Sequence, residues 1–172
     1  WVLRNTGITQ KEPFAWRLSL DSAGTLYLVL ARRSEKGEIG DWQDGALYRS
    51  TDAAAHWEKI QLPQGVNGPS GLCVDARDPK RLYLAAWRRA IPGPNGGGGI
   101  WLSPDGGHTW RAVLSRDQHV YDVTQDAAHP DLLYAAGFES SAWRSVDRGE
   151  TWTRIRGVNF KWNHRVVVDP AD

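Results

Sequence analysis

The segment that decides the fold is Ser103-Pro104-Asp105-Gly106-Gly107-His108-Thr109-Trp110, because the chain also contains two related copies of it. A close copy reads Ser145-Val146-Asp147-Arg148-Gly149-Glu150-Thr151-Trp152. A degraded copy reads Ser50-Thr51-Asp52-Ala53-Ala54-Ala55-His56-Trp57, with Ala54 in place of Gly and His56 in place of Thr. We call these three segments boxes. Since they share the formula Ser-x-Asp-x-Gly-x-Thr-Trp in a constant order, they indicate a repeat architecture.

A second pattern lies between the boxes and keeps the same order. An Asp is followed, five to seven residues later, by the pair Leu-Tyr, and each copy precedes the next box. The copies are Asp21 with Leu26-Tyr27, Asp75 with Leu82-Tyr83, and Asp126 with Leu133-Tyr134, and Val168-Asp169 begins another. Trp1 fits as the last residue of an earlier box. Two interleaved patterns in register show that the whole chain is built from one repeated unit.

Each repeat contains four short β-like runs. In the third repeat they are 120–125, 132–136, 142–145 and 151–155. Four strands in roughly 40 to 50 residues is the size of a β-propeller blade. We therefore predict an all-β fold, a β-propeller segment of about three to four four-stranded antiparallel blades within a larger propeller. The domain prediction is a single propeller segment over 1–172, with units at 1–57, 58–110 and 111–152 and a further unit beginning at 153–172.

The most apolar run of each unit predicts an inner strand that is covered on both faces. These runs are Leu18-Ser19-Leu20, Leu72-Cys73-Val74 and Val166-Val167-Val168. The single cysteine, Cys73, is interpreted as a small core residue within such a strand.

Composition excludes several classes of function. The 172-residue chain has a formal net charge of +1, whereas nucleic-acid-binding proteins show a marked basic excess. No run of 18 apolar residues is present to span a membrane. The chain opens on Trp1 and contains no Met, so we expect an N-terminal part outside this sequence. Three units and two fragments do not close a ring of four to eight blades, so we expect further blades or a covering partner.

The acidic residues of the boxes are interpreted as structural. An Asp carboxylate in a tight turn accepts hydrogen bonds from backbone N–H groups, and glycine tolerates positive φ there. The terminal Trp is large enough to pack between neighbouring blades. An acid that recurs once per repeat serves the repeat rather than a reaction. The residues assigned this structural role are Asp52, Trp57, Asp105, Gly107, Trp110, Asp147, Gly149 and Trp152.

The boxes closely resemble the Asp-box, or bacterial neuraminidase, repeat. That repeat is found in sialidases, xyloglucan-degrading glycoside hydrolases, sortilin-type receptors and photosystem II assembly factors. The resemblance implies that the box turns share one face of the propeller and that the functional site lies on the opposite face. It also implies a location outside the cytoplasm. It does not select one activity, because the box is structural in all of these families.

Candidate binding residues lie in two places that the resemblance assigns to the face opposite the boxes. The segments 31–45 and 87–99 are the longest irregular stretches, which is where binding tends to occur. The starts of the first strands line the mouth of a propeller's central channel, where polar and aromatic residues can hold a carboxylate or a sugar ring, or can merely be hydrated. The candidates are Trp16, Arg17, Trp42, Arg88, Arg89, His119, Tyr121, Asp122, Trp162, His164 and Arg165.

Catalytic interpretations find only partial support. A sialidase needs three arginines and a Tyr–Glu pair; Arg17 and Arg165 supply two arginines, and no such pair is recognisable. Other glycosidases need two carboxylates facing each other, and Asp122 has no evident partner. The five histidines lack metal-ligand spacing, so we expect no metal and no cofactor.

Two functions remain open. The first is a non-catalytic binding or scaffolding module for protein–protein association, whose partners are protein subunits or the rest of the propeller. The second is a fragment of a carbohydrate-active hydrolase of the sialidase or xyloglucanase type, with carbohydrate as its ligand. Neither involves nucleic acid or a membrane span.

Overall fold

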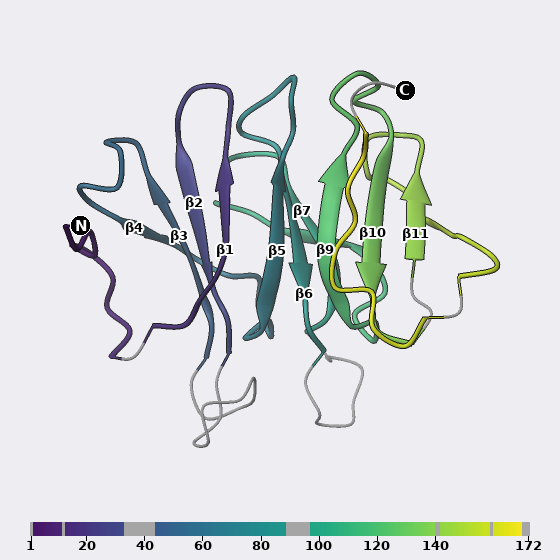
Figure 1. The fold of residues 1–172 in the computed structure, drawn as a ribbon, viewed down its shortest axis with the longest axis horizontal. Helices are drawn as coiled ribbons and strands as arrows, with labels where there is room; N and C mark the ends of the chain where they lie inside the picture. Colours follow the sequence, from purple (N-terminus) through teal and green to yellow (C-terminus); the bar gives the residue numbers. More distant parts are fainter. Residues whose placement is uncertain are drawn as a thin grey trace.

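The computed structural model describes residues 2–11, 13–32, 44–88, 97–139, 142–158 and 160–169, and these contain β-strands but no α-helix. The strands form three four-stranded antiparallel sheets, each made of consecutive strands (Figure 1). The first sheet contains β1 (Ala15–Leu20), β2 (Leu26–Leu30), β3 (Ala46–Ser50) and β4 (Glu58–Ile60). The second contains β5 (Pro69–Val74), β6 (Leu82–Ala86), β7 (Gly99–Ser103) and β8 (Arg111–Leu114). The third contains β9 (Val120–Gln125), β10 (Leu133–Gly137), β11 (Ala142–Ser145) and β12 (Thr153–Arg154).

The described residues include no helix long and apolar enough to cross a membrane. All-β structure with four strands to each repeat confirms the predicted fold class, with strand ends that shift by one or two residues in the third repeat.

The three sheets pack face to face, in the manner of adjacent propeller blades. β5 of the middle sheet contacts β1 and β2 on one side and β9 on the other. One core lies between the first and second sheets and includes Tyr27, Leu47 and Leu84. The other lies between the second and third sheets and includes Tyr83, Ile100 and Trp143. Burial of these apolar faces supplies the main driving force for the arrangement.

Each box forms the turn between the third and fourth strands of its sheet. In the second box the Ser103 hydroxyl donates to Asp105 Oδ1 at 2.8 Å and accepts from Gly107 N at 2.8 Å. Asp105 also accepts from the Thr109 backbone N–H at 2.8 Å and from its hydroxyl at 2.6 Å. The hydroxyl of Thr109 and its N–H hold the pKa of Asp105 at about 2. A carboxylate saturated in this way is unsuited to accept a proton in catalysis.

The glycines of the boxes are placed against the preceding sheet. Gly107 has φ of +93°, and a Cβ on it would lie 2.4 Å from Ile60 Cγ2. Gly149 has φ of +78°, and its Cβ would lie 2.5 Å from Tyr83 Cε1. In the first box Ala54 occupies this position with φ of 66° and packs only at the edge of a smaller cluster around Trp57.

The outer face of the first sheet is partly covered by residues 2–11. The Trp57 indole donates to the Arg4 carbonyl at 3.0 Å, just as the Trp110 indole donates to the Gln61 carbonyl at 2.9 Å. Ile8 packs against the same cluster. Residues 2–11 therefore cover the first box much as the chain after β4 covers the second.

The prediction of inner strands covered on both faces is wrong for two of the three runs. Leu18 and Leu20 on β1 are 58% and 65% exposed, because no other described sheet packs on that side. Residues 166–168 run beside β9 but form no strand in the structure (Figure 1). Residues 166–168 correspond to the first strand of a fourth sheet. Such a strand needs the second strand of the same sheet as its partner, and the described residues include no such partner.

Replacement of Gly149 by alanine tests the contact between a box and the preceding sheet. The change adds positive-φ strain and a clash with Tyr83, so we expect Gly149→Ala to lower the free energy of unfolding by about 2–4 kcal/mol. The matched control is Gly157→Ala, since Gly157 has φ of +83° and open space around it; its cost should stay near 1 kcal/mol. Urea denaturation measures both, and equal losses would show that the close contact is unimportant.

Candidate functional site

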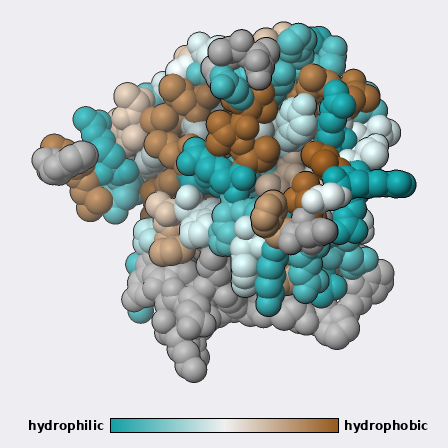
Figure 2. All heavy atoms as spheres, turned by 45° about the vertical axis from the view of Figure 1, so that its right-hand side comes forward, coloured by the Kyte–Doolittle hydropathy of each residue, from teal (hydrophilic) through white to brown (hydrophobic). Residues whose placement is uncertain are grey.

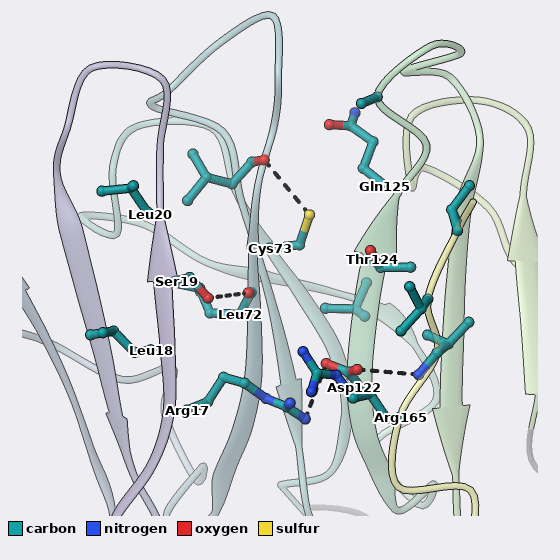
Figure 3. A pocket seen from close by; sticks show the side chains of 16 residues that line it. Arg17, Leu18, Ser19, Leu20, Leu72, Cys73, Asp122, Thr124, Gln125 and Arg165 are labelled. Carbon is teal, nitrogen blue, oxygen red and sulfur yellow. Dashed lines mark hydrogen bonds and ion pairs between the residues drawn. The ribbon is translucent and has the colours of Figure 1, made fainter. Parts of the chain in front are cut away.

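A hollow of about 390 Å³ lies where the inner strands of the three sheets meet residues 165–168 (Figure 3). Side chain to backbone hydrogen bonds connect these segments. Ser19 on β1 donates to the Leu72 carbonyl at 2.8 Å, and Ser70 on β5 donates to the Val120 carbonyl at 2.6 Å. Three of the residues predicted to lie at a channel mouth, Arg17, Asp122 and Arg165, line this hollow.

Arg17 and Asp122 join the first and third sheets across this hollow. The guanidinium of Arg17 lies 3.4 Å from Asp122 Oδ1, and Val166 N donates to Asp122 Oδ2 at 3.2 Å (Figure 3). Gly71 lies between them on β5, and a Cβ there would meet the Tyr121 carbonyl at 2.8 Å and Asp122 Oδ1 at 3.2 Å. The absence of a side chain at Gly71 therefore leaves room for the carboxylate.

The electrostatics of Asp122 are dominated by burial. Burial raises the pKa of this carboxyl above its usual range, while Arg17, the Val166 N–H and Arg165 act in the opposite direction. Among the described residues that line the hollow, Asp122 is the sole carboxylate. The described lining therefore supplies one carboxylate, whereas glycoside hydrolysis uses two facing acids.

A second feature is a cluster of aromatic rings at the end of the sheets opposite the box turns. It consists of Trp87, His119, Tyr121, Phe138, Trp162 and His164, and we call it the aromatic cluster. Tyr121 stacks on His164 at 4.7 Å between ring centroids and meets the edge of Trp87 at 4.7 Å. Phe138 meets Trp162 edge to face at 4.7 Å. The cluster joins the second sheet, the third sheet and the final segment.

Exposure within the aromatic cluster is uneven. Tyr121 is 1% exposed and Trp162 is 52% exposed. Figure 2 shows apolar residues among polar ones on the visible face of the molecule.

A cavity of about 10 Å³, roughly the size of one water molecule, adjoins the cluster and is lined by Trp16, Trp87 and Tyr121. The Tyr121 hydroxyl is buried and has no partner among the described residues, and burial raises its pKa.

Arg88 and His119 form a pair beside the cluster. Arg88 Nε donates to His119 Nε2 at 3.3 Å, so His119 Nε2 accepts and its proton resides on Nδ1. Nδ1 is buried with no acceptor among the described residues. Burial, Arg88 and Arg32 lower the pKa of His119, which keeps the imidazole neutral.

The structure places nine of the eleven predicted site residues, and two lie outside the described part. Arg17, Asp122 and Arg165 line the hollow, and His119, Tyr121, Trp162 and His164 form most of the aromatic cluster. Trp16 lines the small cavity, and Arg88 contacts His119. Trp42 and Arg89 lie outside the described residues.

Sequence reasoning missed Trp87 and Phe138. Both directly follow the second strand of a sheet, four residues after the Tyr of the repeated Leu-Tyr pair. An alignment of the repeats on Tyr83 and Tyr134 shows an aromatic residue in both places, and this was the available signal.

Sequence reasoning also missed a polar network on the box side of the molecule. Arg148 makes two contacts of 3.0 Å with Asp75, whose side chain is fully buried. Tyr83 donates to Asp75 at 3.0 Å, and Arg81 pairs with Glu150 at 2.6 Å. Its donors and acceptors are used within the protein, so this network is structural. In the part of the chain that is described, no group of three His, Cys, Asp or Glu side chains is placed to hold a metal.

Comparison with known proteins finds relatives among xyloglucanases. No family model matches the chain. A xyloglucanase from Acetivibrio thermocellus is 30% identical, over 68% of this chain and 17% of the relative. A xyloglucanase from Paenibacillus sp is also 30% identical, over 68% of this chain and 14% of the relative. The chain spans about a sixth of the length of these curated relatives.

Solved structures similar to this chain are propellers, at low sequence identity. A GH74 enzyme from Niastella koreensis matches with a TM-score of 0.63 and 19% identity, over 84% of this chain and 23% of that one. YCF48 from Cyanidioschyzon merolae matches with a TM-score of 0.58 and 16% identity, over 93% and 44%. A structure of YCF48 bound to D1 peptide matches with a TM-score of 0.55 and 11% identity, over 82% and 39%. The fold and these neighbours define the chain as a β-propeller segment.

Substitutions at Asp122 test the electrostatics of the hollow. Because burial raises its folded pKa, the protonated form favours folding, and that contribution is lost as pH rises through the folded pKa. Asp122→Asn keeps an acceptor for Val166 N–H, so at pH 7 its free energy of unfolding should be within about 1 kcal/mol of native or higher. Asp122→Ala should lose about 1–3 kcal/mol. Urea denaturation at pH 4 and pH 7 checks both, and an equal loss in the two variants would contradict the assignment.

Proposed function

We propose that this chain is the glycan-binding part of a β-propeller related to xyloglucan-degrading hydrolases, and that the aromatic cluster holds the glycan. The observation that carries the proposal is the half-exposed Trp162 beside Phe138, on the end of the sheets opposite the box turns. Sugar rings present C–H groups that pack on aromatic faces, and pockets for small ligands combine such surfaces with few polar groups. The identity to two xyloglucanases supports the same ligand class.

The cluster has the rigidity that a binding platform needs. Trp162 is held against Phe138 by a backbone bridge between the two residues and by their edge-to-face contact. Phe138 N donates to the His119 carbonyl at 3.0 Å, which ties the end of β10 to the start of β9 within the third sheet. Preorganised rings lose little conformational entropy on binding.

In this proposal the chain binds glycan without supplying a catalytic acid pair from its described residues. Asp122 is occupied by Arg17 and Val166 N, and the box carboxylates are saturated by their own turns. Hydrolysis by the whole protein would then require acids outside the described part.

Further proposals follow from the repeat. The boxes are Asp-box repeats, and the protein acts outside the cytoplasm, as the secreted character expected of glycan-degrading enzymes supports. The chain forms one domain segment whose units are those predicted from the sequence. Arg17 and Arg165 stabilise the hollow, whereas Trp16, Tyr121 and His164 support the rings that touch the glycan.

A second candidate is a non-catalytic module that binds a protein, and one observation favours it. Phe160 and Trp162 are 67% and 52% exposed, and aromatic residues are enriched at protein interfaces. In this candidate Phe160 contributes as much as Trp162.

Loss of Trp162 tests the glycan proposal. We expect Trp162→Ala to weaken binding of a xyloglucan oligosaccharide about tenfold, because the exposed ring face is removed. Isothermal titration calorimetry measures the dissociation constants. Val146→Ala serves as a control, since Val146 is 60% exposed but belongs to the third box.

Phe160→Ala separates the two candidates. Under the glycan proposal this variant keeps native affinity for the oligosaccharide, since no ring contact joins Phe160 to the aromatic cluster. If the native chain binds no oligosaccharide at millimolar concentration, the glycan proposal is wrong.

A further inference from the structure

A polar pocket of about 320 Å³ lies beside the aromatic cluster and is lined by Arg88, Asp117, Gln118, His119, Phe138 and Glu139, together with Arg154. This volume is at the lower end of the range for small-molecule sites. Phe138 and His119 belong to both the pocket and the aromatic cluster. A ligand that rests on the cluster therefore has the pocket as its neighbour.

The pocket offers donors that are not used by the described residues. Arg88 Nε donates to His119, while its two terminal nitrogens have no partner among the described residues. The Gln118 side chain also lies in the pocket wall. A guanidinium with its terminal nitrogens available matches the geometry of a carboxylate, which it binds through two parallel hydrogen bonds.

The charges around the pocket select the kind of anion. Arg88 and Arg154 line it, and Lys161 lies 6.0 Å above the Phe138 ring. Asp117 and Glu139 line it as well, so the formal charges of the lining balance and the nearby Lys161 supplies a single positive excess. A singly charged carboxylate suits this balance, whereas the two acids would repel a doubly charged phosphate.

We propose that this pocket binds the carboxylate of an acidic sugar, a uronate, in a glycan whose adjacent rings rest on the aromatic cluster. The inference rests on the proposed glycan-binding function and names the class of glycan. Arg88 determines the specificity in this arrangement, and His119 positions it by accepting the hydrogen bond from its Nε.

The experiment compares two tetrasaccharides of the same linkage. One is cellotetraose, and the other is the β-1,4-linked glucuronate tetramer, in which C6 of every glucose unit is oxidised to a carboxylate. Isothermal titration calorimetry with the 172-residue chain measures both affinities at low and physiological ionic strength. We expect the acidic tetramer to bind about tenfold more tightly, which is equivalent to about 1.4 kcal/mol. The difference should shrink as salt is added, since the pocket is open to solvent.

Arg88→Gln should abolish the preference for the acidic tetramer, so that the ratio of the two dissociation constants falls to about 1. Arg88→Lys, which keeps the charge but loses the planar fork, should restore only part of the preference. Arg77→Gln is the matched control, because Arg77 is a half-exposed arginine that pairs with Asp131 away from the pocket. It should keep the native preference.

The outcomes separate this inference from the proposed function. Binding of cellotetraose without any preference for the acidic tetramer overturns the inference alone. Binding of neither tetramer overturns both. A hexapeptide of glutamate that binds more tightly than either sugar, in a manner dependent on Arg88, would show that the pocket serves a protein carboxylate and would also overturn the inference.

Discussion

The arrangement of the sheets depends on the close approach of the second and third box turns to the sheet before each of them. Gly107 and Gly149 lie against Ile60 and Tyr83 at distances that leave no space for a Cβ. The Ser and Asp of each box hold the turn in the positive-φ conformation that makes this approach possible. Since packed interiors tolerate little change in volume, these contacts set how far apart successive sheets lie. The separation in turn determines where the inner strands meet.

The two ends of the sheets differ in how completely their polar groups are satisfied. On the box side, Asp75 and the residues around it use their donors and acceptors within the protein. On the opposite side, the Tyr121 hydroxyl and His119 Nδ1 are buried without partners among the described residues, and Arg88 has unused donors. Buried polar groups are normally paired, so departures from that rule indicate where a scaffold has been adapted to a task.

Much of the fold was predictable because the repeat is recorded in local sequence. The Ser-x-Asp turn and the Leu-Tyr pair each act within a few residues, and they predicted four strands to each repeat and, in the third repeat, strand ranges that differ from the observed ones by one or two residues. The aromatic cluster was less accessible, because it depends on contacts such as that of Tyr121 with Trp87 and His164, which lie on different repeats. The exposure of Leu18 and Leu20 was missed because it depends on what packs beside β1, which no local pattern records.

Similarity to xyloglucanases bears more strongly on the scaffold than on the site. The box turns recur in all three sheets of this chain, and the solved structures that match it at low identity share its fold. The case for a ligand rests instead on the difference in exposure among tryptophans. Trp57, Trp101 and Trp143 are 6–7% exposed and belong to the cores, whereas Trp162 is 52% exposed in a fixed position against Phe138. Covering a large apolar ring that is otherwise in water is favourable, and this exposure distinguishes Trp162 from the tryptophans of the cores.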